Sequence, residues 1–109
     1  MKKTLLISKN IKEKNMRLDY YIIQERYIDI SNNISTYVYG VEIRRSTGGD
    51  TENTVRRTIR DISCNEKIIA EFIHTLCEND VLPEHLYDIV SEKIDENYFV
   101  EKERELMQA

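Results

Sequence analysis

The spacing of apolar and polar residues changes part-way along the chain. From Met16 to about Ile62, apolar residues tend to alternate with polar ones, and aromatic and β-branched residues are frequent, as strands prefer. After Ser63 the apolar residues recur at three- and four-residue intervals, which is the spacing of one helix face. The sequence therefore predicts a strand-rich first part and a helical second part.

Three strands are predicted in the first part of the chain. They cover residues 16–28, 34–45 and 54–62. The segment 29–33 is expected to turn between the first two strands because Asp, Ser and Asn favour turns. The segment 46–50 is expected to be a loop because it contains the consecutive glycines Gly48 and Gly49. Residues 1–15 leave two alternatives, a short strand over residues 4–7 or a mobile arm.

The alternation also assigns residues to the two faces of the sheet. One face of the second strand is expected to pack under the helices, and it carries Tyr37, Tyr39, Val41 and Ile43. The other face carries Thr36, Val38, Gly40 and Glu42. The third strand is polar, which suits an edge strand that charge protects from pairing with other chains.

Two amphipathic helices are predicted in the second part. Ser63 and Glu66 have the spacing of a capping box, which predicts that the first helix starts there. Its apolar stripe consists of Ile68, Ile69, Phe72, Ile73 and Leu76. Pro83 is typical of a first helical turn, so a second helix is expected from that residue. Residues 97–109 are expected either to extend this helix or to form a separate tail.

These elements predict one α+β domain over residues 1–109. An antiparallel sheet of three to four strands is expected, with a C-terminal helical hairpin packed on one face. Tyr20, Tyr21, Ile22 and Val38 cannot all be buried beneath two helices. We therefore expect an apolar sheet face to remain exposed and to bind a partner.

Composition limits the class of protein. With 109 residues and 40% hydrophobic residues, the chain can form one modest core. No run approaches the roughly 18 apolar residues of a membrane span, and the basic start is followed by an apolar run too short for a secretory signal. We expect a cytoplasmic protein without membrane contact. Cys64 and Cys77 are expected to be free thiols, because they lie at opposite ends of one predicted helix.

Charge is distributed unevenly along the chain, whose net charge is −4. Residues 44–60 carry five arginines and two acidic residues, whereas residues 61–109 carry four basic and thirteen acidic residues. The arginines would lie close together if the second and third strands pair, so they are candidate ligands for phosphates or carboxylates. They are Arg44, Arg45, Arg56, Arg57 and Arg60.

The sequence contains no recognised catalytic or metal-binding pattern. His74 and His85 lie on different predicted helices without a carboxylate or cysteine at a metal-ligand spacing. The Gly48-Gly49 pair lacks the spacing of a phosphate-binding loop. Cys64 lies at a predicted helix N-terminus, where a thiol pKa is lowered, but no basic partner is evident. We therefore expect no enzymatic activity, no cofactor and no metal site.

Three segments carry a resemblance to a known family. They are Tyr39-Gly40-Val41-x-Ile43, Asp61-Ile62-Ser63 and Leu82-Pro83-x-x-Leu86-x-Asp88-Ile89-Val90. Together they resemble a family of small uncharacterised proteins, a domain of unknown function, from clostridial-type spore-forming bacteria. The resemblance covers about residues 20–95 and implies the α+β architecture and a bacterial origin, but no activity.

Two functions remain open from the sequence. The first is a small regulatory or adaptor protein that binds another protein or its own copy, as a possible homodimer. The alternative is a nucleic-acid-binding regulator that uses the arginines of residues 44–60. The acidic character of the whole domain, with a pI near 5.2, favours the first function because nucleic-acid-binding domains are usually basic.

Overall fold

The computed structural model describes residues 1–48 and 50–108 of the chain. In this part four β-strands precede three α-helices, and a 3-10 turn, η1 (Lys12–Lys14), joins the first two strands. The strands are β1 (Lys2–Ile11), β2 (Met16–Asp29), β3 (Ile34–Thr47) and β4 (Asp50–Ser63). The helices are α1 (Glu66–Glu78), α2 (Pro83–Asp95) and α3 (Tyr98–Gln108). The predicted α+β class is confirmed, and none of the helices in these residues is long and apolar enough to span a membrane.

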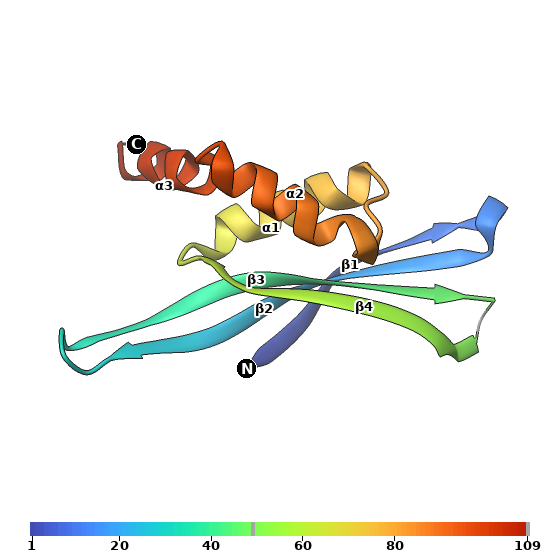
Figure 1. The fold of residues 1–109 in the computed structure, drawn as a ribbon, viewed down its shortest axis with the longest axis horizontal. Helices are drawn as coiled ribbons and strands as arrows, with labels where there is room; N and C mark the ends of the chain where they lie inside the picture. The colour runs from blue at the N-terminus through green and yellow to red at the C-terminus, as the bar shows by residue number, and fades with distance from the viewer. Residues whose placement is uncertain (49, 109) are drawn as a thin grey trace.

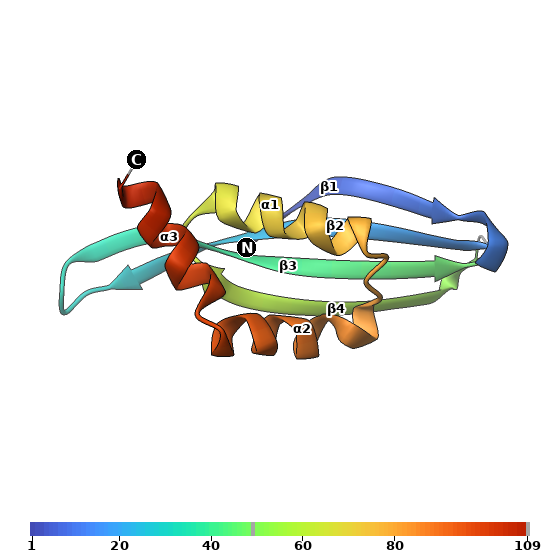
Figure 2. The ribbon, with the colours of Figure 1, turned by 90° about the horizontal axis from the view of Figure 1, so that it is seen from above.

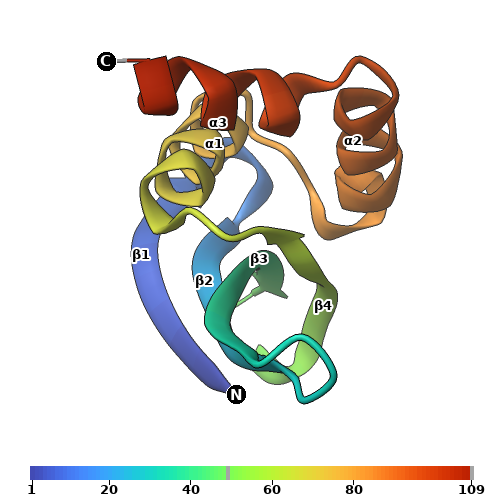
Figure 3. The same ribbon diagram turned by 90° about the vertical axis from the view of Figure 1, so that its left-hand side faces the viewer.

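The strands form one antiparallel sheet in the order β1-β2-β3-β4, so each strand pairs with its neighbours in the sequence. The sheet is strongly twisted, and all three helices lie on one of its faces (Figures 1 and 3). Seen from above, α1 runs lengthwise over the strands and α2 lies beside β4 (Figure 2). At the N-terminus, where an arm and a short strand were the alternatives, Lys2–Ile11 forms a strand paired with β2.

Turn residues have the backbone conformations that their types favour. Asn15 and Asn33 adopt positive φ angles of 49° and 53° in the turns that follow η1 and β2. Gly48 has a φ of 68° in the loop between β3 and β4. Gly49 of the predicted glycine loop lies outside the described residues. The following strand begins at Asp50, so this loop is shorter than predicted.

The predicted capping box is wrong. Asn65 is the N-cap of α1, and its side-chain oxygen accepts a hydrogen bond from the backbone N–H of Ile68 at 3.1 Å. Ser63 instead ends β4, where its hydroxyl donates to Glu103 of α3 at 2.7 Å and accepts from the N–H of Asn65. The strand continues through Ser63, so the helix starts later than the sequence pattern suggested.

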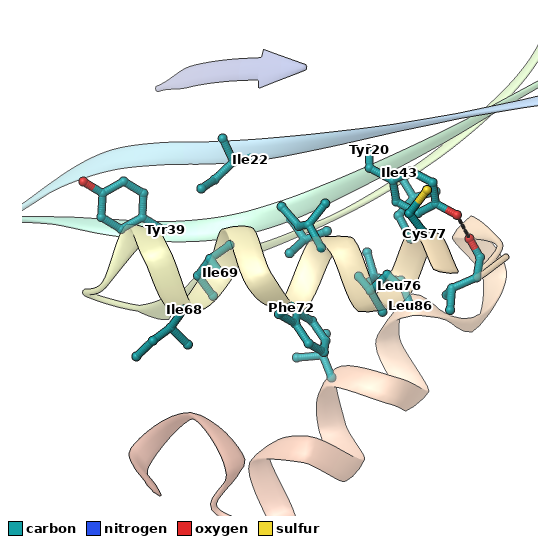
Figure 4. Close-up of a cluster of buried hydrophobic side chains, with 14 of the residues drawn as sticks. Tyr20, Ile22, Tyr39, Ile43, Ile68, Ile69, Phe72, Leu76, Cys77 and Leu86 are labelled. Atoms are coloured by element: carbon teal, nitrogen blue, oxygen red, sulfur yellow. Dashed lines mark hydrogen bonds between the residues drawn. The ribbon is translucent and has the colours of Figure 1, made fainter. Parts of the chain in front are cut away.

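The core lies between the helices and the sheet face that β2 and β3 turn toward them (Figure 4). The helix stripe predicted for α1 is buried, as are Tyr39, Val41 and Ile43 of β3. Tyr20 donates a hydrogen bond from its hydroxyl to the carbonyl of Val81 at 3.0 Å, which satisfies the polar end of a buried ring.

One member of the predicted core face lies outside the core. Tyr37 has 49% of its surface exposed. It pairs with Arg26 on the part of β3 that has no partner on β4.

The prediction that Tyr20, Tyr21, Ile22 and Val38 cannot all be buried beneath the helices is confirmed, because Tyr21 is only partly buried and Val38 lies on the other face. Tyr20 and Ile22 belong to the core under the helices. Val38 is buried on the opposite face, which we call the open face. Three helices rather than two lie over the sheet, because Tyr98–Gln108 forms α3 and packs Phe99 edge-to-face on Phe72 at 5.1 Å.

A close backbone approach occurs at Gly40 in the middle of β3. A Cβ atom at this position would lie 2.2 Å from the carbonyl oxygen of Ile59 and 2.9 Å from the Cα of Arg60. The register of β4 shifts here, because Val41 pairs with Ile59 whereas Tyr39 pairs with Ser63. We call the segment 60–62 the β4 bulge. Asp61 in this bulge has a φ of 54°, which is uncommon for a residue with a side chain.

We predict that Gly40→Ala destabilises the fold far more than Gly48→Asn. The added methyl group at Gly40 would overlap backbone atoms that cannot rotate away, so the free energy of unfolding should fall by about 1–3 kcal/mol or more. Gly48 has positive φ, which Asn tolerates, and a Cβ there meets only Asn15 Nδ2 at 3.9 Å. Urea denaturation measures both changes. Equal losses in the two variants would contradict the close approach.

Candidate interaction surface

The hairpin formed by β2 and β3 extends past the rest of the sheet (Figure 1). Among the described residues, β2 pairs with β1 only as far as Gln24, and β3 pairs with β4 only from Tyr39 onward. Residues 25–38 therefore form a two-stranded ribbon whose two outer edges have no strand beside them. We call this segment the hairpin tip.

Large apolar side chains are exposed on the hairpin tip. Ile30 in the turn has 89% of its surface exposed, and the others are between 45% and 60% exposed. They are Tyr27, Ile28, Ile34 and Tyr37. Neighbouring exposed apolar groups on one element are typical of surfaces that bind other proteins.

A groove lies between the hairpin tip and the β4 bulge. Its volume is about 350 Å³. It is lined by Glu25, Arg26, Tyr27, Val38, Arg60 and Asp61. Arg60 donates two hydrogen bonds to the carboxylate of Glu25, one of them from Nε at 2.6 Å, and this contact lowers the pKa of Glu25. The groove therefore combines two apolar side chains, Tyr27 and Val38, with the ion pair of Arg60 and Glu25.

The middle of the open face is closed by polar side chains rather than by helices. Glu42 of β3 is fully buried there. Its carboxylate accepts hydrogen bonds from Lys3 Nζ at 2.9 Å, Arg44 Nε at 2.5 Å and Thr58 Oγ1 at 2.5 Å. The guanidinium of Arg44 also lies 4.2 Å from the ring centre of Tyr21. These contacts join β1, β3 and β4 through one carboxylate.

The ionisation of Glu42 follows from these contacts. Burial opposes the charged form and by itself raises the pKa of a carboxyl group. The hydrogen bonds from Thr58, Lys3 and Arg44 favour the charged form and outweigh burial, so the pKa of Glu42 lies below its ordinary value. Glu42 is therefore a carboxylate in a structural ion-pair cluster.

The structure divides the five predicted arginines between the two faces of the sheet and the β4 bulge, although Arg44 and Arg56 are direct cross-strand partners. Register places Arg44 and Arg56 on the open face, and Arg45 and Arg57 on the face toward the helices. Arg60 lies in the bulge. Three of them bond carboxylates of the same chain, because Arg44 contacts Glu42, Arg45 contacts Glu84 and Arg60 contacts Glu25. In the described part of the chain Arg56 and Arg57 contact no carboxylate, and Arg57 donates to the carbonyl of Arg56 at 2.8 Å.

The cysteines and histidines do not converge on a site. Both thiols are free, as predicted; Cys64 is exposed and Cys77 is buried. Burial raises the pKa of Cys77, which disfavours the reactive thiolate. Within residues 1–48 and 50–108, no group of three or more His, Cys, Asp or Glu side chains could hold a metal ion.

The comparisons with known proteins give a family but no activity. Residues 1–96 match the model of a family of unknown function, DUF6514. The chain belongs to this family. No curated protein and no solved structure matches it significantly. The family assignment agrees with the resemblance to a domain of unknown function, and it carries no information on origin.

The part that matches DUF6514 ends before α3. This helix carries a second exposed apolar surface, a groove of about 470 Å³ lined by Val100, Glu103, Arg104 and Met107.

The hairpin tip lies within the DUF6514 match. Sequence reasoning missed the hairpin tip, although one signal was present: Ile30 stands inside a predicted turn, where an apolar side chain has no core to enter.

We predict that Glu42→Gln lowers the stability of this DUF6514 protein and flattens its pH dependence. The pKa of Glu42 is lower in the folded chain than its value of 4.5 in the unfolded chain. The ionised carboxylate therefore stabilises the fold at pH values above 4.5, and this contribution is lost as the pH falls through the pKa of the folded chain. At pH 7 the variant should lose about 1–3 kcal/mol of unfolding free energy.

Urea denaturation between about pH 7 and pH 3 measures both effects. Glu92→Gln makes the same chemical change at an exposed position of α2 and serves as the control. A Glu42→Gln variant that matches this control in stability and pH profile would show that the cluster contributes nothing.

Proposed function

We propose that this protein is a non-enzymatic regulatory or adaptor protein that acts by binding another protein or its own copy. The observation that carries the proposal is the hairpin tip, where five large apolar side chains are exposed on a protruding ribbon. Water contact with these groups is unfavourable, and a binding partner that covers them would remove that cost.

The geometry of the hairpin tip supports a binding role. The ribbon is continuous with the central strands of the sheet, because β2 and β3 pair along their whole length from Met16 with Thr47 to Asp29 with Ile34. A partner would thus meet a surface that the core already holds in place. Binding to a pre-ordered surface avoids part of the entropy cost of association.

The alternative of nucleic-acid binding through residues 44–60 has weaker support. Three of its five arginines are engaged with carboxylates, and the set is divided between two faces. Arg56 and Arg57 are the two that would remain for phosphate contacts. A phosphate site of this kind would give binding that weakens steeply as salt rises.

Two further proposals concern the setting of the protein. We infer a cytoplasmic location from two free cysteines, because thiols persist in reducing compartments. We also infer an origin in a clostridial-type spore-forming bacterium from the sequence resemblance. Neither inference bears on the choice between the two binding functions.

The experiment uses a photo-crosslinking amino acid at position 30, in cells that naturally make the protein. Crosslinked products are separated and identified by mass spectrometry. We expect a defined product from position 30, containing either a second protein or a second copy of the chain. The matched control places the same amino acid at Tyr87, an aromatic residue of α2 that is 72% exposed.

A variant test accompanies the crosslinking. With the crosslinker kept at position 30, the Ile28→Ser/Ile34→Ser double variant should abolish the product, whereas Tyr87→Ser/Ile94→Ser removes two exposed apolar groups from α2 and should preserve it. No product above the Tyr87 background would overturn the proposal. Micromolar binding of an oligonucleotide at physiological salt, lost in an Arg56→Ala/Arg57→Ala variant, would favour the nucleic-acid alternative instead.

A further inference from the structure

One outer edge of the hairpin tip lacks the features that usually protect strand edges. Residues 34–38 of β3 read Ile-Ser-Thr-Tyr-Val and contain no charged residue and no proline. In the described structure β4 does not pair with them, because its last partner on β3 is Tyr39. Their outward backbone N–H and C=O groups are therefore available to another strand. We call this segment the free β3 edge.

The other edges of the sheet carry charges. The outer strand β1 has Lys2, Lys3 and Lys9, and the outer strand β4 has Arg56 and Arg57. On the hairpin tip, the β2 edge has Glu25, Arg26 and Asp29. Charged side chains on an edge oppose pairing with further strands. The free β3 edge is thus the place where an added strand meets the least repulsion.

We infer that the free β3 edge pairs with the same edge of a second copy, in an antiparallel two-fold dimer. This inference rests on the proposed binding function of the hairpin tip and names its partner. With the two-fold axis at Thr36, each Ile34 lies opposite Val38 of the other copy, and each Ser35 lies opposite Tyr37. Cross-strand pairs of β-branched and apolar residues stabilise a sheet.

The self-complementarity is specific to this edge. An equivalent antiparallel pairing of the β2 edge about Tyr27 would place Glu25 opposite Asp29 in both halves of the dimer. Like charges directly opposite each other destabilise a strand pair. The uncharged β3 edge has no such conflict, and a two-fold arrangement uses the same patch on both copies.

The groove beside the bulge provides a place for the incoming side chain. Register puts Ile34, Thr36 and Val38 on the open face of the sheet. Ile34 of the second copy would therefore lie next to Val38, where the groove of about 350 Å³ has Val38 and Tyr27 among its lining residues. Ile34 is 46% exposed in the single chain, so pairing would bury apolar surface on both copies.

The size of the contact sets the expected strength. A strand pair of five residues with a few apolar side chains buries less than the roughly 1,200 Å² of a standard interface, so we expect a weak dimer. Sedimentation velocity on the full chain, from about 10 µM to about 1 mM, should show a mass that rises from one copy toward two. The same samples are checked by circular dichroism for an unchanged fold.

Charge substitution at the two-fold axis tests the geometry. Thr36→Lys places two like charges opposite each other, as does Thr36→Glu, so each variant alone should be monomeric over this range. An equimolar mixture of the two should regain the dimer, because Lys then faces Glu. Thr36→Val keeps the β-branched shape without charge and should dimerise as the wild type does.

The outcomes separate this inference from the proposed function. A wild-type chain that stays monomeric at every concentration, or a dimer that Thr36→Lys and Thr36→Glu leave intact, would overturn the self-pairing. A crosslink from position 30 to a different protein, with a monomeric wild type, would overturn the self-pairing while the binding function stands. A wild-type chain that stays monomeric and gives no crosslinked product from position 30 would contradict both the self-pairing and the proposed binding function.

Discussion

The difference in length between the strands and the helices governs this structure. A strand of 14 residues, such as β2 or β3, extends over about 46 Å, whereas a helix of 13 residues, such as α1 or α2, extends over about 20 Å. The longest dimension of the molecule, 49 Å, is therefore set by the sheet. Helices of this length cannot cover both ends of such strands, so part of the sheet must protrude. The hairpin tip is the protruding part that carries apolar side chains.

The two faces of the sheet are stabilised by different forces. Toward the helices, burial of apolar side chains such as Tyr20 and Phe72 dominates. On the open face, the single carboxylate of Glu42 holds groups from three strands. An ion cluster of this kind requires every partner to be in place, since an unpaired buried charge is costly. A shift in the register of β1 or β4 would move Lys3 or Thr58 away from this carboxylate. The ordered sheet in turn holds the hairpin tip in position.

Periodicity in the sequence was sufficient for the class of fold and for most of the core, because alternation and the three-to-four spacing report directly on which side chains face inward. Features that depend on contacts distant in sequence were missed. The start of α1 was misplaced at Ser63 because β4 continues through this residue, and the serine hydroxyl bonds Glu103 of α3 instead. The arginines 44, 45 and 60 looked like one cluster, yet each bonds a different carboxylate, and Glu84 and Glu25, the partners of Arg45 and Arg60, are distant in sequence. Ile28 and Tyr37 lie on the face that the helices partly cover, and their exposure depends on where the helices end, which no local pattern encodes.

The β4 bulge determines how much of β3 is left without a neighbour. Val41 pairs with Ile59, so a β4 strand that continued without a bulge would place Ser63 opposite Tyr37. The observed register places Ser63 opposite Tyr39. The bulge thus contains two residues of β4 that would otherwise continue the pairing along β3. Because Gly40 makes room for this insertion and Ile62 within it packs against the core, a change in its length would also move the contacts that Ile62 and Ser63 make with the helices. The capacity of this fold to join with other chains is therefore tied, through this local insertion, to the packing of its own core.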